Sequence, residues 1–125
     1  MASKKILIID DEPTLLITLE QILGKDNAIT KAQGGRAAFN LLKKRSDQFD
    51  VMVTDLNMPD VNGIDLFRYL VGSNPQLAKH TVFTTGGSFT ASMTEFISST
   101  KNPCIEKPFT REQLFQAINS VLEVA

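Results

Sequence analysis

The chain has 125 residues, 42% of them hydrophobic, and a formal net charge of −1, which are typical of one globular domain with a real core. Its 13 basic and 14 acidic residues form no long block of either sign, so we expect neither a nucleic-acid partner nor an anionic membrane. No apolar run approaches the ~20 residues of a membrane span, and the single cysteine suits a reducing, cytoplasmic location. We therefore expect one cytoplasmic domain over residues 1–125.

Two strand–helix units are predicted in the first third of the chain. Residues 4–10 form a short aliphatic run that ends in acids, which is typical of a buried strand. Pro13 follows at a position that favours the first turn of a helix, and leucines and isoleucines then recur at helical spacing. Residues 28–32 are more polar and predict an edge strand, after which Gly34 and Gly35 open a second helix.

The stretch DVMVTDLNMPDVNG, residues 50–63, organises the rest of the sequence. Its apolar run fits a strand buried on both faces, and that strand ends at Asp55. Pro59 and Gly63 mark the loop that follows, and a third helix is expected from residue 64 to about Gly72. Asp55 is thus placed where a buried strand opens into a loop, the edge of an open sheet at which ligands bind.

The last third of the chain predicts two more units. Residues 80–85 and 103–106 are short strands, and the Ser/Thr-rich segment 88–100 predicts a marginal, mobile helix, because hydroxyl side chains compete with helical hydrogen bonds. Thr110 and Gln113 have the spacing of a capping box at the start of a final helix.

Alternating strands and helices predict an α/β fold. We expect a (βα)5 flavodoxin-like domain, with a five-stranded parallel sheet of order 2-1-3-4-5 and helices on both faces. The switch point of that topology lies between the first and third strands, which end at Asp10-Asp11 and at Asp55. The predicted topology therefore brings three carboxylates together.

Three carboxylates in one crevice require a compensating cation. Two unit charges ~4 Å apart interact by about 4 kcal/mol at an effective dielectric constant near 20. Mg²⁺, for which Mn²⁺ could substitute, prefers oxygen ligands and often joins carboxylates to a phosphoryl group. Thr85 and Lys107 follow the fourth and fifth strands, and with the Gly86 N–H they offer the donors that a phosphoryl group needs. The set predicts an aspartyl-phosphate site.

The sequence resembles the receiver domain of two-component response regulators over essentially its whole length. The resemblance rests on these residues in this order: Asp10-Asp11, Asp55-Leu-Asn-Met-Pro, Thr85-Gly86 and Lys107-Pro108-Phe109. It implies that Asp55 accepts a phosphoryl group from the phosphohistidine of a sensor histidine kinase or a histidine phosphotransfer protein. It also implies that Mg²⁺ is bound by Asp11, Asp55 and the main-chain carbonyl of Asn57, with Asp10 assisting through a water molecule.

The resemblance also implies how such a domain signals. Lys107 would pair with the phosphoryl oxygens, and the Thr85 hydroxyl would move to bond one of them. The chain would then be a signalling phosphoacceptor and not an enzyme, catalysing only its own phosphorylation and dephosphorylation. A downstream partner would bind the face formed by residues 88–122. Family members often carry an aromatic switch residue at the position of Cys104, so we expect signalling here to rely on Thr85 and loop movement.

Several alternatives stay open from the sequence. The runs TTGGSFT and NPCIEKPF are similar in style to receivers of hybrid histidine kinases, although a stand-alone receiver fits the length equally well. A hydrolase of the haloacid dehalogenase kind would use Asp10 as its nucleophile, but Glu12 occupies the position of its second aspartate. A pseudo-receiver would only bind partners. Thr84 competes with Thr85 for the hydroxyl role, whereas His80 is expected to be exposed and not a metal ligand.

Overall fold

A computed structural model describes residues 3–87 and 89–123. Its centre is one parallel sheet of the order β2-β1-β3-β4-β5, which confirms the predicted topology. The strands are β1 (Lys5–Asp10), β2 (Ala28–Gln33), β3 (Val51–Asp55), β4 (Thr81–Thr85) and β5 (Cys104–Glu106). Parallel pairing aligns Asp10 with Gln33 and Asp55 with Thr84, so the carboxyl ends of the strands meet at one edge of the sheet.

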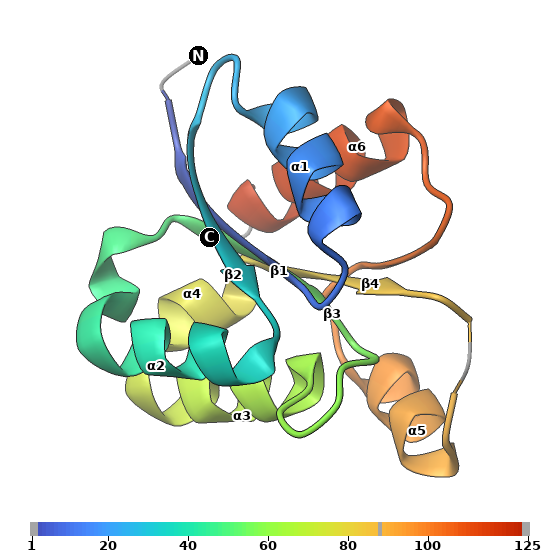
Figure 1. Ribbon diagram of the computed structural model, residues 1–125. Coiled ribbons are helices and arrows are strands. Elements are labelled where there is room, and N and C mark those ends of the chain that lie inside the picture. The colour runs from blue at the N-terminus through green and yellow to red at the C-terminus, as the bar shows by residue number, and fades with distance from the viewer. Residues whose placement is uncertain (1–2, 88, 124–125) are drawn as a thin grey trace.

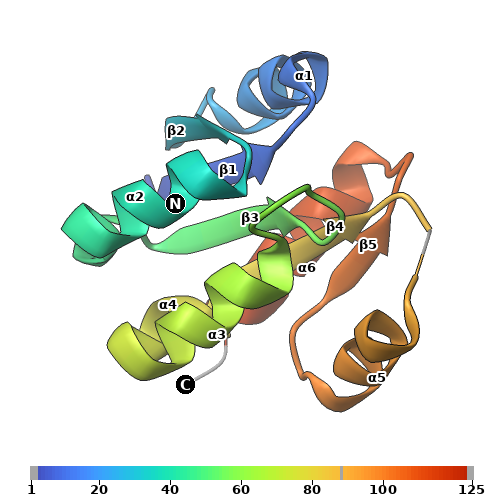
Figure 2. The same cartoon turned by 60° about the horizontal axis from the view of Figure 1, so that its bottom comes forward.

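Helices cover both faces of this sheet, as Figures 1 and 2 show. One face carries α1 and α6, and the other carries α2, α3, α4 and α5. The helices are α1 (Pro13–Leu23), α2 (Gly35–Arg45), α3 (Gly63–Ser73), α4 (Pro75–Lys79), α5 (Ala91–Ser99) and α6 (Arg111–Leu122), with a 3₁₀ turn, η1 (Ser46–Gln48), after α2.

The core divides according to the alternation of side chains along the strands. Ile6 and Ile8 of β1 face the cluster that contains buried residues of α1 and α6. Leu7 and Ile9 face the opposite cluster, with buried residues of α2 and α3. Because successive strand residues point to opposite faces, a central strand covered on both sides must be apolar at nearly every position. This explains the continuous apolar runs at residues 6–9 of β1 and 51–53 of β3.

The short helix α4 is an element that the sequence analysis did not predict. The expected end of the third helix near Gly72 is close to the observed end of α3 at Ser73, but a new helix begins at once. The Asn74 side chain accepts a hydrogen bond from the Leu77 N–H at 3.2 Å, and Pro75 occupies the first helical position. An asparagine cap followed by proline is a helix-start signal that could have identified this turn.

Helix α5 begins later than the predicted range of 88–100, and Ser88 lies outside the described residues. Thr90 caps the helix by accepting the Met93 N–H at 3.2 Å. Met93 is the buried residue of this helix, which agrees with weak anchoring, while its mobility stays a prediction. The capping box of α6 is confirmed: the Thr110 hydroxyl accepts from the Gln113 N–H, and the Gln113 side chain accepts from the Thr110 N–H.

Among the described residues, the helices are all too short or too polar to cross a bilayer.

Candidate metal and phosphoryl site

Three carboxylates meet where the sequence predicts. One oxygen each of Asp10, Asp11 and Asp55 can be chosen so that all three lie within 4.8 Å of one another. Asp10 ends β1 and Asp55 ends β3, and these two strands are hydrogen-bonded neighbours. The two aspartates are far apart in the sequence, but the pairing of β1 with β3 brings them together at the switch point of the sheet.

Lys107 bridges two of the carboxylates from the loop that follows β5. Its ammonium Nζ lies 2.8 Å from Oδ2 of Asp10 and 3.0 Å from Oδ2 of Asp55. The aspartate side chains are only 1% and 4% exposed, and that of Lys107 is 19% exposed. At this burial, an unpaired charge would cost several kcal/mol, so the lysine offsets part of the negative charge in the crevice.

The pKa of the Asp55 carboxyl is raised above its usual value, and burial is the largest cause. The hydrogen bond from the Asn57 N–H to Oδ1, at 2.9 Å, and the ammonium of Lys107 act in the opposite direction, while the charge of Asp10 raises the pKa further. Burial lowers the Lys107 pKa, but its hydrogen bonds to Asp10 and Asp55 outweigh that effect and leave the pKa raised.

The donor set fits a hard divalent cation. Its members are carboxylate oxygens, which Mg²⁺ and Mn²⁺ accept as ligands, and no histidine or thiol belongs to the cluster among the described residues. Asp10 is oriented by two donors, because Oδ1 accepts the Glu12 N–H at 2.9 Å and Oδ2 accepts Lys107. The hydrogen bond between Asn57 and Asp55 places residue 57 beside the cluster, whereas the use of its main-chain carbonyl as a ligand stays a prediction.

Thr85 lies at the same edge of the sheet, and its hydroxyl is engaged. Oγ1 donates to Oδ1 of Asn57 at 3.1 Å and accepts the Gly87 N–H at 3.1 Å. Thr84 is also buried, but it precedes Thr85 in β4, so its side chain points to the other face of the sheet. The contact with Asn57 identifies Thr85 as the threonine that belongs to this site.

A hollow of about 610 Å³ lies between α1 and the loop that follows β5, and among the site residues Lys107 lines it but the three aspartates do not. Gly86 and Lys107 line it together with Phe109 and residues of α1. A Cβ at Gly86 would meet no atom within 4 Å, so the entrance is open at this point.

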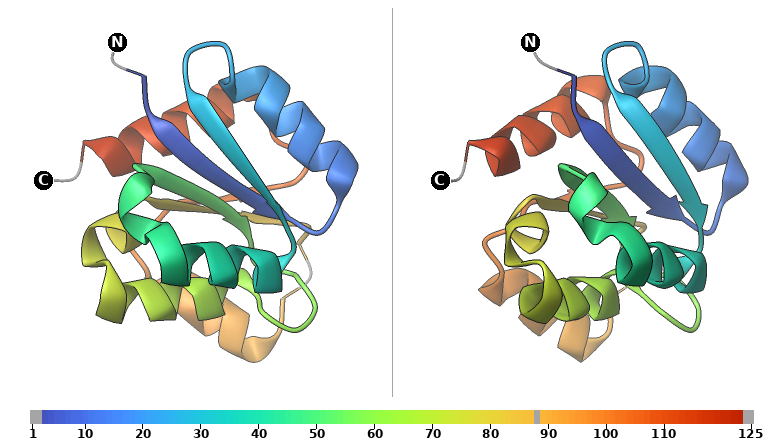
Figure 3. Two further views of the ribbon diagram at one scale, coloured as in Figure 1. Left: turned by 60° about the vertical axis from the view of Figure 1, so that its left-hand side comes forward. Right: turned by 90° about the vertical axis from the view of Figure 1, so that its left-hand side faces the viewer.

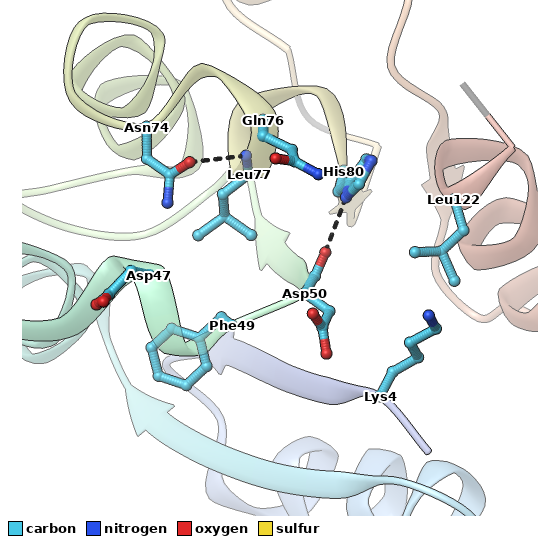
Figure 4. A pocket seen from close by; sticks show the side chains of 9 residues that line it. All are labelled: Lys4, Asp47, Phe49, Asp50, Asn74, Gln76, Leu77, His80 and Leu122. Atoms are coloured by element: carbon cyan, nitrogen blue, oxygen red, sulfur yellow. Dashed lines mark hydrogen bonds between the residues drawn. The ribbon is translucent and has the colours of Figure 1, made fainter. Parts of the chain in front are cut away.

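A different hollow, of about 390 Å³, lies at the amino ends of the strands and is shown in Figure 4. There Nδ1 of His80 lies 3.0 Å from the main-chain oxygen of Asp50. His80 is half-exposed and does not belong to the carboxylate cluster.

Cys104, at the expected position of an aromatic switch residue, is half-buried on β5 and pairs in register with Phe83. Burial, and then the charges of Asp55 and Glu106, raise the pKa of its thiol. An aromatic group that was not predicted from the sequence lies beside it. Phe67, Phe83 and Phe96 meet edge to face, with ring centroids 5.3–5.6 Å apart, and join α3, β4 and α5.

Two contacts at the site were not predicted. Asn57 is a predicted metal ligand through its main-chain carbonyl only, but its side chain also accepts a hydrogen bond from Thr85 and lies 3.9 Å from the Met93 sulfur through Nδ2. Gly63, read as a turn residue, packs against β3: a Cβ there would lie 2.5 Å from the main-chain oxygen of Asp55. The sequence shows Gly63 only as a turn residue at the end of the loop that follows Asp55. Its close approach to β3 is a tertiary contact that the local sequence does not indicate.

Comparisons with known proteins agree with this geometry. A family model of the response regulator receiver domain matches residues 6–119. The chemotaxis protein CheY homologue of Campylobacter jejuni is 29% identical over 121 residues, which cover 94% of this chain and 92% of that protein. A two-component response regulator of Oryza sativa is 36% identical over 67 residues, which cover 53% of this chain and 12% of the relative. The chain thus spans only a small part of several longer curated relatives.

Solved structures show the same arrangement. A response regulator receiver domain protein from Clostridium thermocellum superposes with a TM-score of 0.83 at 27% identity, covering 98% of this chain and 94% of that one. A response regulator receiver protein from Sinorhizobium medicae gives a TM-score of 0.81 at 28% identity, covering 98% and 96%. Because the family model spans most of the chain, we conclude that this protein is a member of the response regulator receiver domain family.

Proposed function

We propose that this chain is the phosphoacceptor of a two-component phosphorelay. Asp55 takes a phosphoryl group from the phosphohistidine of a sensor histidine kinase or a histidine phosphotransfer protein, in a Mg²⁺-dependent reaction. The observation that carries the proposal is the convergence of Asp10, Asp11 and Lys107 on the buried Asp55 carboxylate. Membership of the receiver family supports it.

The residues divide the chemistry among them. A carboxylate oxygen of Asp55 forms the new O–P bond as the N–P bond of the donor breaks, and the leaving imidazole keeps the electron pair of that bond. Lys107 already contacts Oδ2 of Asp55, so its ammonium is placed to pair with phosphoryl oxygens. Asp10, Asp11, Asp55 and the Asn57 carbonyl would hold Mg²⁺, which when bound neutralises charge on the phosphoryl oxygens.

Phosphorylation would act as a switch through Thr85. Shifting a two-state equilibrium from 1:99 to 99:1 requires about 5.5 kcal/mol of differential interaction. Charge-assisted hydrogen bonds from Lys107, Thr85 and main-chain N–H groups, at about 1.5–3 kcal/mol each, could supply it. With Cys104 in place of an aromatic switch residue, the change would reach the 88–122 face through Thr85 and the loop before α5, and a downstream partner would bind there.

The setting of the domain is part of the proposal. The chain acts as a signalling phosphoacceptor and not as an enzyme with a separate substrate, and both a stand-alone regulator and the receiver of a longer protein accommodate that role. A chain with a single cysteine cannot form an internal disulfide, which is compatible with a cytoplasmic location.

Intact-protein mass spectrometry after incubation with acetyl phosphate tests the proposal. We expect one added phosphoryl group that requires Mg²⁺ and disappears in Asp55→Asn, while Asp47→Asn, an exposed control outside the site, labels like the wild type. Labelling that survives Asp55→Asn and is lost in Asp10→Asn would support the hydrolase alternative instead. If neither acetyl phosphate nor a phosphorylated histidine phosphotransfer domain labels the wild type, the chain is a partner-only domain and the proposal is wrong.

A further inference from the structure

Two consecutive glycines, Gly34 and Gly35, join β2 to α2 and have no role in the proposed chemistry. Figure 3 shows that this junction lies beside the end of β1 and the loop before α3. Those two segments carry the proposed metal ligands, Asp10 and Asp11 on one side and Asn57 on the other. The junction is therefore adjacent to the segments that carry the proposed ligands, but it contributes no side chain to the site.

Gly34 is tied to the end of β1. Its N–H donates to the main-chain oxygen of Asp10 at 3.0 Å, which extends the β1–β2 ladder by one bond beyond the pairing of Asp10 with Gln33. Its φ is +94°, a backbone conformation that side chains other than glycine strain to adopt. The position of the Asp10 main chain is thus coupled to a conformation that requires glycine.

Gly35 is in direct contact with the loop before α3. A Cβ on Gly35 would overlap the main-chain oxygen of Val61 and would lie 2.9 Å from the Val61 Cβ. Both are atoms of the loop's own framework and not the flexible end of a side chain, so the loop would have to move to admit a methyl group. The close packing of α2 on this loop is possible only with glycine.

A second contact joins the same two elements. The Arg36 guanidinium donates to Oδ2 of Asp60 at 3.0 and 3.2 Å, and Asp60 has a φ of +69°. The two side chains are 60% and 65% exposed, so this ion pair contributes little by itself. It nevertheless shows that two successive loop residues, Asp60 and Val61, contact the start of α2.

The loop has little freedom between its two ends. At its start, the Asn57 N–H is bound to Asp55, and at its end Gly63 packs against the Asp55 main chain. The contact of Val61 with Gly35 fixes the segment between them. We expect a displacement at Val61 to be passed along the loop to the main chain of Asn57, which carries a proposed metal ligand.

We infer that the Gly34-Gly35 pair is a positioning element for the metal site, setting the distance between the end of β1 and the loop that carries Asn57. The inference rests on the proposed function, since it concerns the same Mg²⁺ site. It assigns to two glycines outside the site a part in metal affinity, distinct from their part in folding.

Calorimetric titration with Mg²⁺ alone tests the inference. The variant is Gly35→Ala, and the matched control is Gly72→Ala, where an added Cβ on α3 would meet no atom within 4 Å. We expect Gly35→Ala to lower Mg²⁺ affinity by about tenfold or more, the size of effect seen when residues that orient metal ligands are lost. Gly72→Ala should bind like the wild type. The melting temperature without Mg²⁺ separates this effect from a loss of folding, and the Asn57 amide shift in the metal-free NMR spectrum should move in Gly35→Ala only.

Gly34→Ala provides the second variant if Gly35→Ala does not fold. Its methyl group would meet no atom within 4 Å, so it introduces backbone strain without a clash, and we expect a several-fold loss of Mg²⁺ affinity. A folded Gly35→Ala, or in its absence Gly34→Ala, that binds Mg²⁺ within twofold of the wild type would overturn the inference and leave the proposed function intact. A wild type that binds no Mg²⁺ would instead overturn the proposed function, and the inference with it.

Discussion

Replacing Asp55 with asparagine should make the metal-free protein more stable at neutral pH. The substitution removes one of three clustered negative charges and keeps the shape of the side chain. At a separation of at most 4.8 Å, the buried Asp10 carboxylate repels that of Asp55 by about 3.5 kcal/mol at an effective dielectric constant near 20, whereas the more exposed Asp11 is screened by solvent. On the same scale Lys107, at 3.0 Å, attracts it by about 5.5 kcal/mol. The attraction to Lys107 therefore exceeds the repulsion from Asp10, and burial of the carboxylate is the largest cause that disfavours its ionised form.

From these opposing terms we expect a gain of about 1–3 kcal/mol in the free energy of unfolding at pH 7.5. The pH dependence follows from the raised pKa of Asp55. Above both the folded and the unfolded pKa, the ionised carboxylate destabilises the folded state. As the pH falls through the folded pKa towards the ordinary value of 3.8, the wild type takes up its proton and the advantage of the variant disappears.

Urea unfolding followed by circular dichroism, with EDTA present, measures the difference at pH 7.5 and at pH 4.5. Asp47→Asn is the control for loss of an exposed negative charge. Added Mg²⁺ should close the gap, because it stabilises the wild type by binding the folded state and binds the variant less well. If Asp55→Asn is less stable than the wild type at pH 7.5 in EDTA, attraction to Lys107 dominates and the reasoning fails.

Three further predictions concern single side chains. Lys107→Ala should still bind Mg²⁺ when measured by calorimetry. Phosphorylation of this variant, however, should no longer change the NMR shifts of residues in the 88–122 face. If phosphorylation changes these shifts as in the wild type, the proposed switch is wrong. The pKa of Lys107 is raised in the folded state, so its ion pairs stabilise the fold fully below the ordinary value of 10.5 and are lost as the pH rises through the folded pKa. The difference in unfolding free energy between the wild type and Lys107→Ala should therefore narrow only in strong alkali. Cys104 should react slowly with a disulfide reagent at pH 7.5, since burial raises its thiol pKa, and rapid labelling of the folded protein would refute this.

Local signals in the sequence were sufficient to predict the strands and their ends. Aliphatic runs such as that of β1, followed by acids, proline or glycine, identify buried strands because both faces of a central strand must be apolar. The α6 capping box was likewise visible in the spacing of Thr110 and Gln113. The start of α4 was missed because its signal, Asn74 followed by Pro75, was read as the end of the preceding helix.

The sequence by itself determined the sheet order, because alternating strands and helices permit few topologies. It also determined that Asp10, Asp11 and Asp55 meet, because the strand order sets which strand ends are neighbours. Only the tertiary structure decided which side chains contact one another at that edge. Lys107 bonds to Asp10 across 97 positions of sequence, Thr85 is held by Asn57, and Gly35 packs on Val61. These contacts depend on side-chain rotamers and on the close approach of separate loops, which no local pattern of residues encodes.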